Sequence, residues 1–192
     1  MYRDTVGKVT VGVGLMLSDT KAAESLPFVL GSRPATPQEI AAEYTRVDSL
    51  PQARASAFYK SPNSLELPQQ TIDAKLTTVL ETFETDLRTH LPHYDTLPDA
   101  VKLALLDMTY NLGPAALFKD FPHLIAAVES GSWAQAAACC MRRGPSAARN
   151  NWTREQFLSA VVTTIQAEAD TFLKRIRRLI RQTWNALFGP RH

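Results

Sequence analysis

The segment Y-R-D-T-V-G-K-V-T-V-G-V-G, residues 2–14, decides how the first part of the chain is interpreted. From Lys8 onward, apolar side chains occupy every second position: Val9, Val11, Val13, Leu15 and Leu17. This period of two predicts one half-buried strand over residues 8–17. Asp4-Thr5-Val6-Gly7 has the composition of a turn, so we expect residues 1–17 to form a β-hairpin with a very short opening strand.

The following part of the chain has helical periodicity interrupted by proline and glycine. Thr36-Pro37-Gln38-Glu39 is a capping box with proline at the first helical position, and it predicts a helix over 37–48. Three prolines predict a loop-rich interval over 49–70, in which a short helix at 52–59 remains an alternative. Apolar residues at helical spacing then predict a long amphipathic helix over 71–90.

The second half of the chain is expected to be helical as well. Leu97-Pro98-Asp99 opens a helix that Gly113 ends, with Pro114 supporting the stop. Two further helices are expected over 121–129 and 133–143. Thr153 is a candidate cap for a final helix over about 156–188.

Size and composition exclude several classes of protein. The 192 residues suffice for one domain or for two small lobes that share a core. Hydrophobic residues make up 45% of the chain and charged residues 21%, which is typical of globular proteins rather than disordered or membrane proteins. The net charge of +2 argues against nucleic acid as a partner.

Cysteine and histidine placement argues against a disulfide framework and a metal site. Cys139 and Cys140 are adjacent, so we expect thiols packed in the core. The histidines do not form a helical i,i+4 pair with a carboxylate, so we expect no metal and no cofactor.

Six residues of the opening segment follow the spacing Y-x-D-x-x-G-x-x-T-x-G-x-G: Tyr2, Asp4, Gly7, Thr10, Gly12 and Gly14. This segment resembles the hairpin of the phage-type (T-even-like) lysozymes, which are muramidases. Three later stretches are similar to that family more weakly: Ala104–Gly113, Trp133 with Ala136-Ala137, and Arg142–Asn151. The resemblance covers about residues 2–162.

The resemblance implies an α+β, lysozyme-like fold. The lysozyme-like domain would span 1–162, with a hairpin lobe over 1–70, a connecting helix over 71–90 and a helical lobe over 97–162. Residues 163–192 would form a basic amphipathic helical extension.

The resemblance also implies roles at the hairpin. Cleavage of a glycosidic bond needs an acid for the leaving oxygen and a second group that activates water or stabilises the cationic centre. Asp4 would take the second role and Thr10 would bind the same water or the sugar, while Tyr2, Gly12 and Gly14 would contact substrate. The alternative is that Asp4 caps the turn and the two glycines mark a bulge.

The general acid is not matched in these residues. In the family a glutamate precedes the hairpin aspartate by roughly nine residues, whereas three residues precede Asp4 here, so a truncated start is one expectation. Glu24 matches no family acid and is expected to be solvated. Arg149 resembles an arginine that lines the family's cleft, and Asn111 would support the cleft; each is alternatively a solvent-facing polar residue.

The end of the chain combines cations with apolar residues in the pattern of a basic amphipathic helix. The cations are Lys174, Arg175, Arg177, Arg178 and Arg181. This helix would contact an anionic membrane or envelope polymer, or alternatively pack its apolar face on the helical lobe.

Together these features predict a peptidoglycan hydrolase that cleaves β-1,4 bonds between N-acetylmuramic acid and N-acetylglucosamine. The alternative is a truncated or non-catalytic lysozyme-like protein that binds cell-wall glycan or a partner. Because no apolar run could span a bilayer and the first residues do not form a signal peptide, we expect cytoplasmic synthesis and action in the periplasm or cell wall after delivery or lysis.

Overall fold

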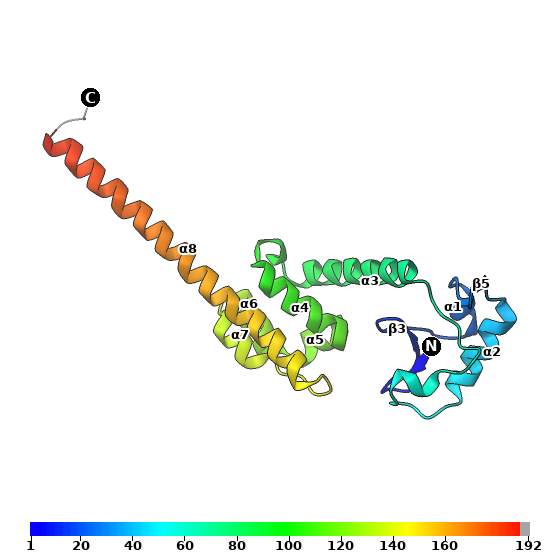
Figure 1. The fold of residues 1–192 in the computed structure, drawn as a ribbon. Helices are drawn as coiled ribbons and strands as arrows, with labels where there is room; N and C mark the ends of the chain where they lie inside the picture. Colours follow the sequence, from blue (N-terminus) through cyan, green and yellow to red (C-terminus); the bar gives the residue numbers. More distant parts are fainter. Residues whose placement is uncertain (189–192) are drawn as a thin grey trace. The chain divides into compact units, whose positions relative to one another are not determined.

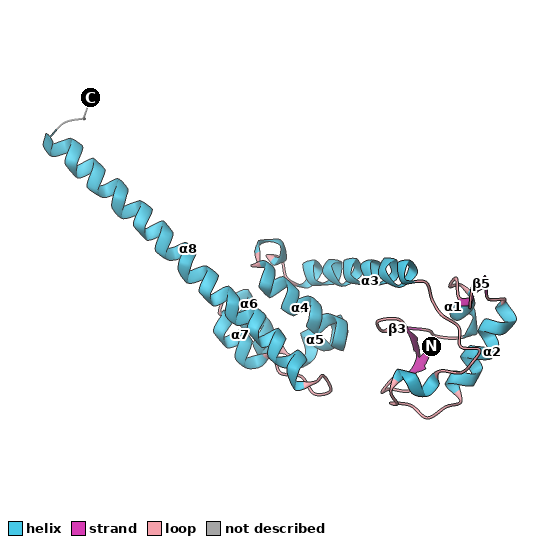
Figure 2. Ribbon diagram, in the orientation of Figure 1, coloured by secondary structure: helices cyan, strands magenta, loops and turns pink. Residues whose placement is uncertain are grey.

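The computed structural model describes the backbone of residues 1–188 and the side chains of residues 1–179. It is a mixed helical structure with short antiparallel strands, in the broad α+β class (Figures 1 and 2). The chain divides into two compact units, Met1–Glu81 and Thr82–His192, called here the first and the second unit. All strands of the described residues belong to the first unit.

The opening segment contains the predicted hairpin, with its short opening strand, and a further strand extends it to a three-stranded antiparallel sheet. Its strands are β1 (Tyr2–Arg3), β2 (Val9–Val11) and β3 (Leu15–Met16), in the order β1-β2-β3. The expectation of one strand over 8–17 was wrong because Gly12 and Gly14 adopt φ values of +59° and +113°, which turn the chain back. Val13 is therefore exposed in the turn.

The remainder of the first unit consists of short elements around a small core. These are α1 (Thr20–Glu24), β4 (Val29–Leu30), β5 (Arg33–Pro34), α2 (Pro37–Asp48) and the 3-10 helix η1 (Ser56–Tyr59). Phe28, Val47 and Tyr59 are among its fully buried side chains. The Tyr59 hydroxyl lies 2.9 Å from the Arg3 carbonyl oxygen and 2.7 Å from that of Pro51, and by donating to one or the other it links β1 to the loop-rich interval.

The predicted helix over 37–48 is confirmed as α2, together with its cap. The Thr36 hydroxyl accepts from the Glu39 amide at 3.3 Å, and the Glu39 carboxylate accepts from the Thr36 amide at 2.8 Å. Arg33 also donates to this carboxylate. The hydrogen bonds from Arg33 and Thr36 lower the pKa of Glu39 to about 2.

The long helix expected over 71–90 is α3 (Gln69–His90). The division between the two units falls inside this helix, after Glu81. Leu87 is its buried residue and belongs to the core of the second unit.

The second unit contains a 3-10 helix, η2 (Tyr94–Thr96), and five α-helices. These are α4 (Asp99–Leu112), α5 (Pro114–Asp120), α6 (Pro122–Glu129), α7 (Trp133–Cys139) and α8 (Ala147–Phe188). Met108, Leu117, Leu124 and Phe157 are fully buried between them. Cys140 is also buried, which raises the pKa of its thiol, and both cysteines are free.

The expected end of α4 at Gly113 is confirmed, and this glycine has a φ of +81°. Pro114 also begins α5, which the sequence did not predict, because proline fits the first turn of a helix as well as it stops one. Two other expectations for this unit were wrong. The helix expected over 133–143 ends at Cys139. The final helix begins at Ala147 rather than near 156, so Thr153 lies inside it and is no cap.

Helix α8 has 42 residues and changes its environment along its length. Up to Thr164 it packs on α4 and α7, and the Trp133 indole donates to the Thr164 hydroxyl at 3.1 Å. Residues 165–179 are exposed apart from the half-buried Ile176, and α8 projects past α4, α6 and α7 of its own unit (Figure 1). The alternative that the apolar face of the extension packs on the helical lobe is therefore wrong for residues 165–179.

Among the described residues, none of the helices combines the length and the apolar character that crossing a bilayer requires.

Candidate functional site

The turn between β1 and β2 is organised around Asp4. Its Oδ1 atom accepts hydrogen bonds from the amides of Val6 (3.0 Å) and Lys8 (2.8 Å). The backbone closes the same turn, since the Asp4 amide donates to the Lys8 carbonyl at 2.9 Å. One carboxylate oxygen of Asp4 thus caps the turn, as the structural alternative expected.

The other oxygen of Asp4 meets Thr10. The Thr10 hydroxyl lies 3.2 Å from Oδ2 of Asp4 and 3.2 Å from the Lys8 carbonyl oxygen. A hydroxyl has one proton, so it donates to one of these acceptors at a time. Thr10 pairs with Tyr2 across the ladder, and this register carries its side chain to Asp4.

Burial separates the two residues. Thr10 is 2% exposed, whereas Asp4 is partly exposed. A carboxylate oxygen can accept more than one hydrogen bond, so Oδ2 can bind a water molecule while it contacts Thr10. Asp4 can therefore hold water at a carboxylate whose orientation Thr10 helps to fix.

The glycines of the motif have a packing role that the sequence did not reveal. A Cβ atom on Gly12 would lie 3.1 Å from Cγ2 of Ile72, at the start of α3. A Cβ atom on Gly7 would lie 2.5 Å from Oε1 of Gln52. Gly12 and Gly14 form a turn, in which the Gly14 amide lies 3.4 Å from the Val11 carbonyl oxygen. The positive φ of Gly12 and its close approach to Ile72 thus favour glycine at this position with or without a substrate.

Glu43 is a buried carboxylate that sequence reasoning missed. The Arg46 guanidinium donates to both of its oxygens, at 2.7 and 2.9 Å, and also to the Tyr59 carbonyl. Glu43 lies on the buried stripe of α2 between Ile40 and Val47, and the spacing of these three residues could have revealed it. It lines a hollow of about 530 Å³, but its oxygens are already occupied by Arg46.

Glu24 is exposed at the end of α1, in agreement with the expectation that it is solvated. Within the part of the chain that the structure describes, no group of three or more His, Cys, Asp or Glu residues is arranged to hold a metal ion.

In the second unit, Arg149 belongs to a polar network centred on Asp107 of α4. Arg149 Nε donates to Oδ1 of Asp107 at 2.8 Å, while Arg142 Nη2 and the Thr153 hydroxyl bond Oδ2 at 2.7 and 2.8 Å. The side chain of Arg142 is 0% exposed and that of Asp107 is 13% exposed. Asn150 completes the network by accepting from Arg142 Nε at 3.2 Å.

The charges of this network shift its carboxylate. Burial alone would raise the pKa of Asp107, but hydrogen bonds from Arg149, Thr153 and Arg142 outweigh burial and lower the pKa. Arg149 is 40% exposed, and its guanidinium is held by Asp107. Asn111, four residues after Asp107 on α4, is exposed.

The predicted site residues therefore form two separate sets. Asp4, Thr10 and Tyr2 meet in the first unit, and Arg149 belongs to the second unit, as does Asn111. The sequence missed Asp107 and its buried partner because nothing local in α4 marks an aspartate that bonds residues 35 and 42 positions later.

Comparisons of the chain with models of protein families, with curated proteins and with solved structures find no match.

Proposed function

We propose that this chain is a peptidoglycan hydrolase of the phage-lysozyme type, a muramidase with a lysozyme-like fold. The observation that carries the proposal is the contact between Asp4 and Thr10 at the turn of β1 and β2, on residues that have the spacing of the lysozyme hairpin. The two compact units, with strands in the first and helices in the second, are compatible with it.

In this proposal Asp4 is the carboxylate that positions and deprotonates water. Its Oδ1 atom is fixed by the Val6 and Lys8 amides, so Oδ2 has a defined direction. Water held at Oδ2 attacks the anomeric carbon, its proton passes to the carboxylate, and the bond to the leaving oxygen breaks as an acid protonates that oxygen. The lysozyme resemblance assigns the acid to a glutamate roughly nine residues before the hairpin aspartate. No residue of this sequence matches that glutamate, so the residues of the chain supply the water-activating half of the step alone.

A specific observation favours a second candidate, a non-catalytic protein that binds cell-wall glycan. Asp4 already caps a turn through Oδ1, and Thr10 is almost completely buried. Both features suit a carboxylate with a structural role in the turn.

Clearing of a purified peptidoglycan suspension by the full chain separates the two candidates. Asp4→Asn removes the carboxylate but leaves an amide oxygen that can still accept from the Val6 and Lys8 amides. Asp99→Asn, at a side chain that is almost fully exposed on α4, is the matched control. The hydrolase proposal expects clearing that Asp4→Asn abolishes and Asp99→Asn retains.

Borohydride reduction of the products tests the bond that is cleaved, because a muramidase leaves N-acetylmuramic acid at the new reducing ends. If the chain sediments with insoluble peptidoglycan without releasing reducing ends, the non-catalytic candidate replaces the hydrolase.

A further inference from the structure

The exposed part of α8 has an apolar face that does not continue the face packed on the second unit. Successive residues of an α-helix are turned by about 100°. Thr153, Phe157 and Ala160 form the buried stripe, whereas Ile165, Phe172 and Ile176 lie on a stripe that is turned by roughly a third of a circle around the axis. The apolar residues beyond Thr164 therefore face away from the direction of their own unit's core.

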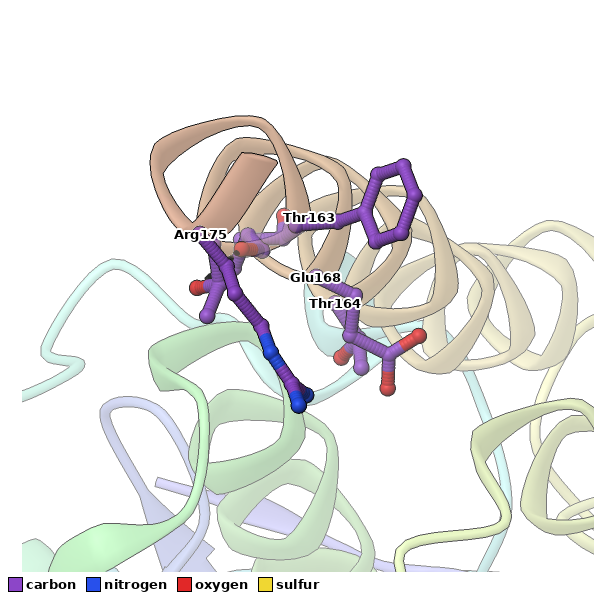
Figure 3. A pocket seen from close by; sticks show the side chains of 7 residues that line it. Thr163, Thr164, Glu168 and Arg175 are labelled. Atoms are coloured by element: carbon purple, nitrogen blue, oxygen red, sulfur yellow. Dashed lines mark hydrogen bonds between the residues drawn. The ribbon is translucent and has the colours of Figure 1, made fainter. Parts of the chain in front are cut away.

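The side of α8 that does continue the buried stripe becomes polar. Thr164, Ala167, Thr171 and Arg175 succeed one another on this side, and with Glu168 and two neighbours they line an open depression that belongs to α8 alone. Figure 3 shows Thr163, Thr164, Glu168 and Arg175 on this face of one helix. This change of character explains why packing against α7 ends near Thr164.

Cations occupy the surface opposite the apolar stripe. Lys174 and Arg178 lie at its centre, and Arg175 and Arg177 flank the apolar face on its two borders. From Thr171 to Leu179 the helix carries four positive charges and no acidic residue, and with Glu168 and Asp170 before this run residues 165–179 have a net charge of +2. The predicted fifth cation, Arg181, lies outside the described side chains.

The apolar stripe is exposed as well as segregated. Ile165 is 60% exposed, Phe172 62% and Leu173 50%. A helix with an apolar face on one side and Lys and Arg on the other suits the boundary between lipid headgroups and acyl chains, where the apolar face is buried and the cations meet anionic headgroups.

We propose that residues 165–179 of α8 form an interfacial helix that docks on a bilayer rich in anionic phospholipid. Charge complementarity selects this occupant over a second copy of the chain. Consider a parallel pair of these helices with Ile165 and Phe172 in the seam between them. The seam is then flanked by Glu168, Leu173 and Arg175. Across the pair, charged residues would lie next to apolar residues instead of next to residues of opposite charge. Pairing would also bring together two helices with the same excess of positive charge.

Binding of the full chain to sedimenting vesicles tests the proposal. Vesicles of phosphatidylglycerol and phosphatidylcholine are compared with pure phosphatidylcholine at low ionic strength. Each Lys or Arg near an anionic surface contributes about fivefold to the partition coefficient, so replacing the four cations with glutamine should lower binding by about a hundredfold or more. The cations are Lys174, Arg175, Arg177 and Arg178.

A control variant loses the same number of charges from exposed side chains elsewhere. These are Lys21, Lys119, Arg143 and Arg154, each changed to glutamine. This variant has the same net charge as the first, so it should keep most of the binding if the face of α8, rather than the charge of the whole chain, is responsible. Equal losses in the two variants would overturn the proposal.

Phe172→Ser with Leu173→Ser tests the apolar contribution and should lower binding by about a hundredfold, since each large apolar side chain contributes tenfold or more when buried. Leu103→Ser with Met141→Ser, at exposed apolar residues of the same unit, is the control. The proposal fails if the Phe172 and Leu173 variant binds anionic vesicles like the unchanged chain. It also fails if sedimentation velocity shows a dimer that this variant dissociates, without any vesicle binding.

Discussion

Replacement of Asp107 with alanine removes the anion that neutralises Arg142, whose side chain is completely buried. Arg142 Nη2 loses a partner at 2.7 Å and keeps neutral acceptors, chiefly the Thr153 hydroxyl. Removing one member of a buried ion pair costs about 3–5 kcal/mol because the other charge remains in a medium of low dielectric constant. For a unit of this size we expect the melting temperature to fall by roughly 10–20 °C.

Arg149→Met is the matched control for this experiment. Arg149 bonds the same carboxylate, at 2.8 Å, but is 40% exposed, so its loss should cost at most about 1 kcal/mol. Adding Arg142→Met to Asp107→Ala removes the uncompensated charge and should recover at least about 1 kcal/mol.

Urea unfolding followed by tryptophan fluorescence measures these changes in the right part of the chain. All three tryptophans, Trp133, Trp152 and Trp184, have positions in the second unit. The dependence of stability on acid pH gives a second measurement. Because the pKa of Asp107 is lower in the folded state than the unfolded value of about 3.9, its carboxylate stabilises the fold above about pH 3.9 and stops doing so as the pH falls through the folded-state pKa. If Asp107→Ala costs no more than Arg149→Met, the interpretation of the network as a buried ion pair is wrong.

Two further predictions concern the first unit. Gly12→Ala should lower the free energy of unfolding by about 1–2 kcal/mol in urea, because φ is +59° and Cγ2 of Ile72 lies 3.1 Å from the added Cβ. Gly31→Ala, at φ +62° with open space around it, should lower the free energy of unfolding by less. An equal loss in the two variants would contradict the packing role of Gly12. The pKa of Glu39 is about 2 in the folded state and about 4.3 in the unfolded state, so its carboxylate should stabilise the fold above about pH 4.3 and lose that effect as the pH falls toward 2. Glu39→Gln should remove this dependence of stability on acid pH. A titration of the Glu39 carboxyl at about pH 4.3 by NMR would contradict the prediction.

Features with local causes were predicted from the sequence, and features with distant causes were not. The capping box at Thr36 and Glu39 defines the start of α2 by itself, and the structure confirms it. The end of α4 before Pro114 was predicted, but the start of α5 at this residue was not, because proline suits both the end of one helix and the first turn of the next. Thr153 has the residue type of a cap, but its hydroxyl bonds Asp107 on another helix.

In the candidate site too, the contacts with local causes could be predicted and those with distant causes could not. The contact between Asp4 and Thr10 could be expected from the motif, because their separation of six residues fits one hairpin turn. The ion pair of Asp107 with Arg142 could not, since it depends on how α4 meets the segment before α8. The rotation of the apolar stripe along α8 was present in the sequence, but it became informative once the structure showed where packing on α7 ends.

The contact between the Tyr59 hydroxyl and β1 should form later in folding than the turn at Asp4. The hydroxyl bonds the carbonyl of Arg3, a residue 56 positions earlier, and closing a loop of this length is slower than closing the turn at Asp4. A chain emerging from the ribosome therefore displays the Asp4 turn long before it contains the tyrosine that secures β1. Arg3 also donates to the Leu50 carbonyl at 2.9 Å, and the Ala53 amide donates to the Asp4 carbonyl at 3.2 Å, so β1 depends on its short ladder with β2 until residues 50–59 are synthesised. Mutations at Tyr59 should slow the rate at which β1 acquires protection from hydrogen exchange.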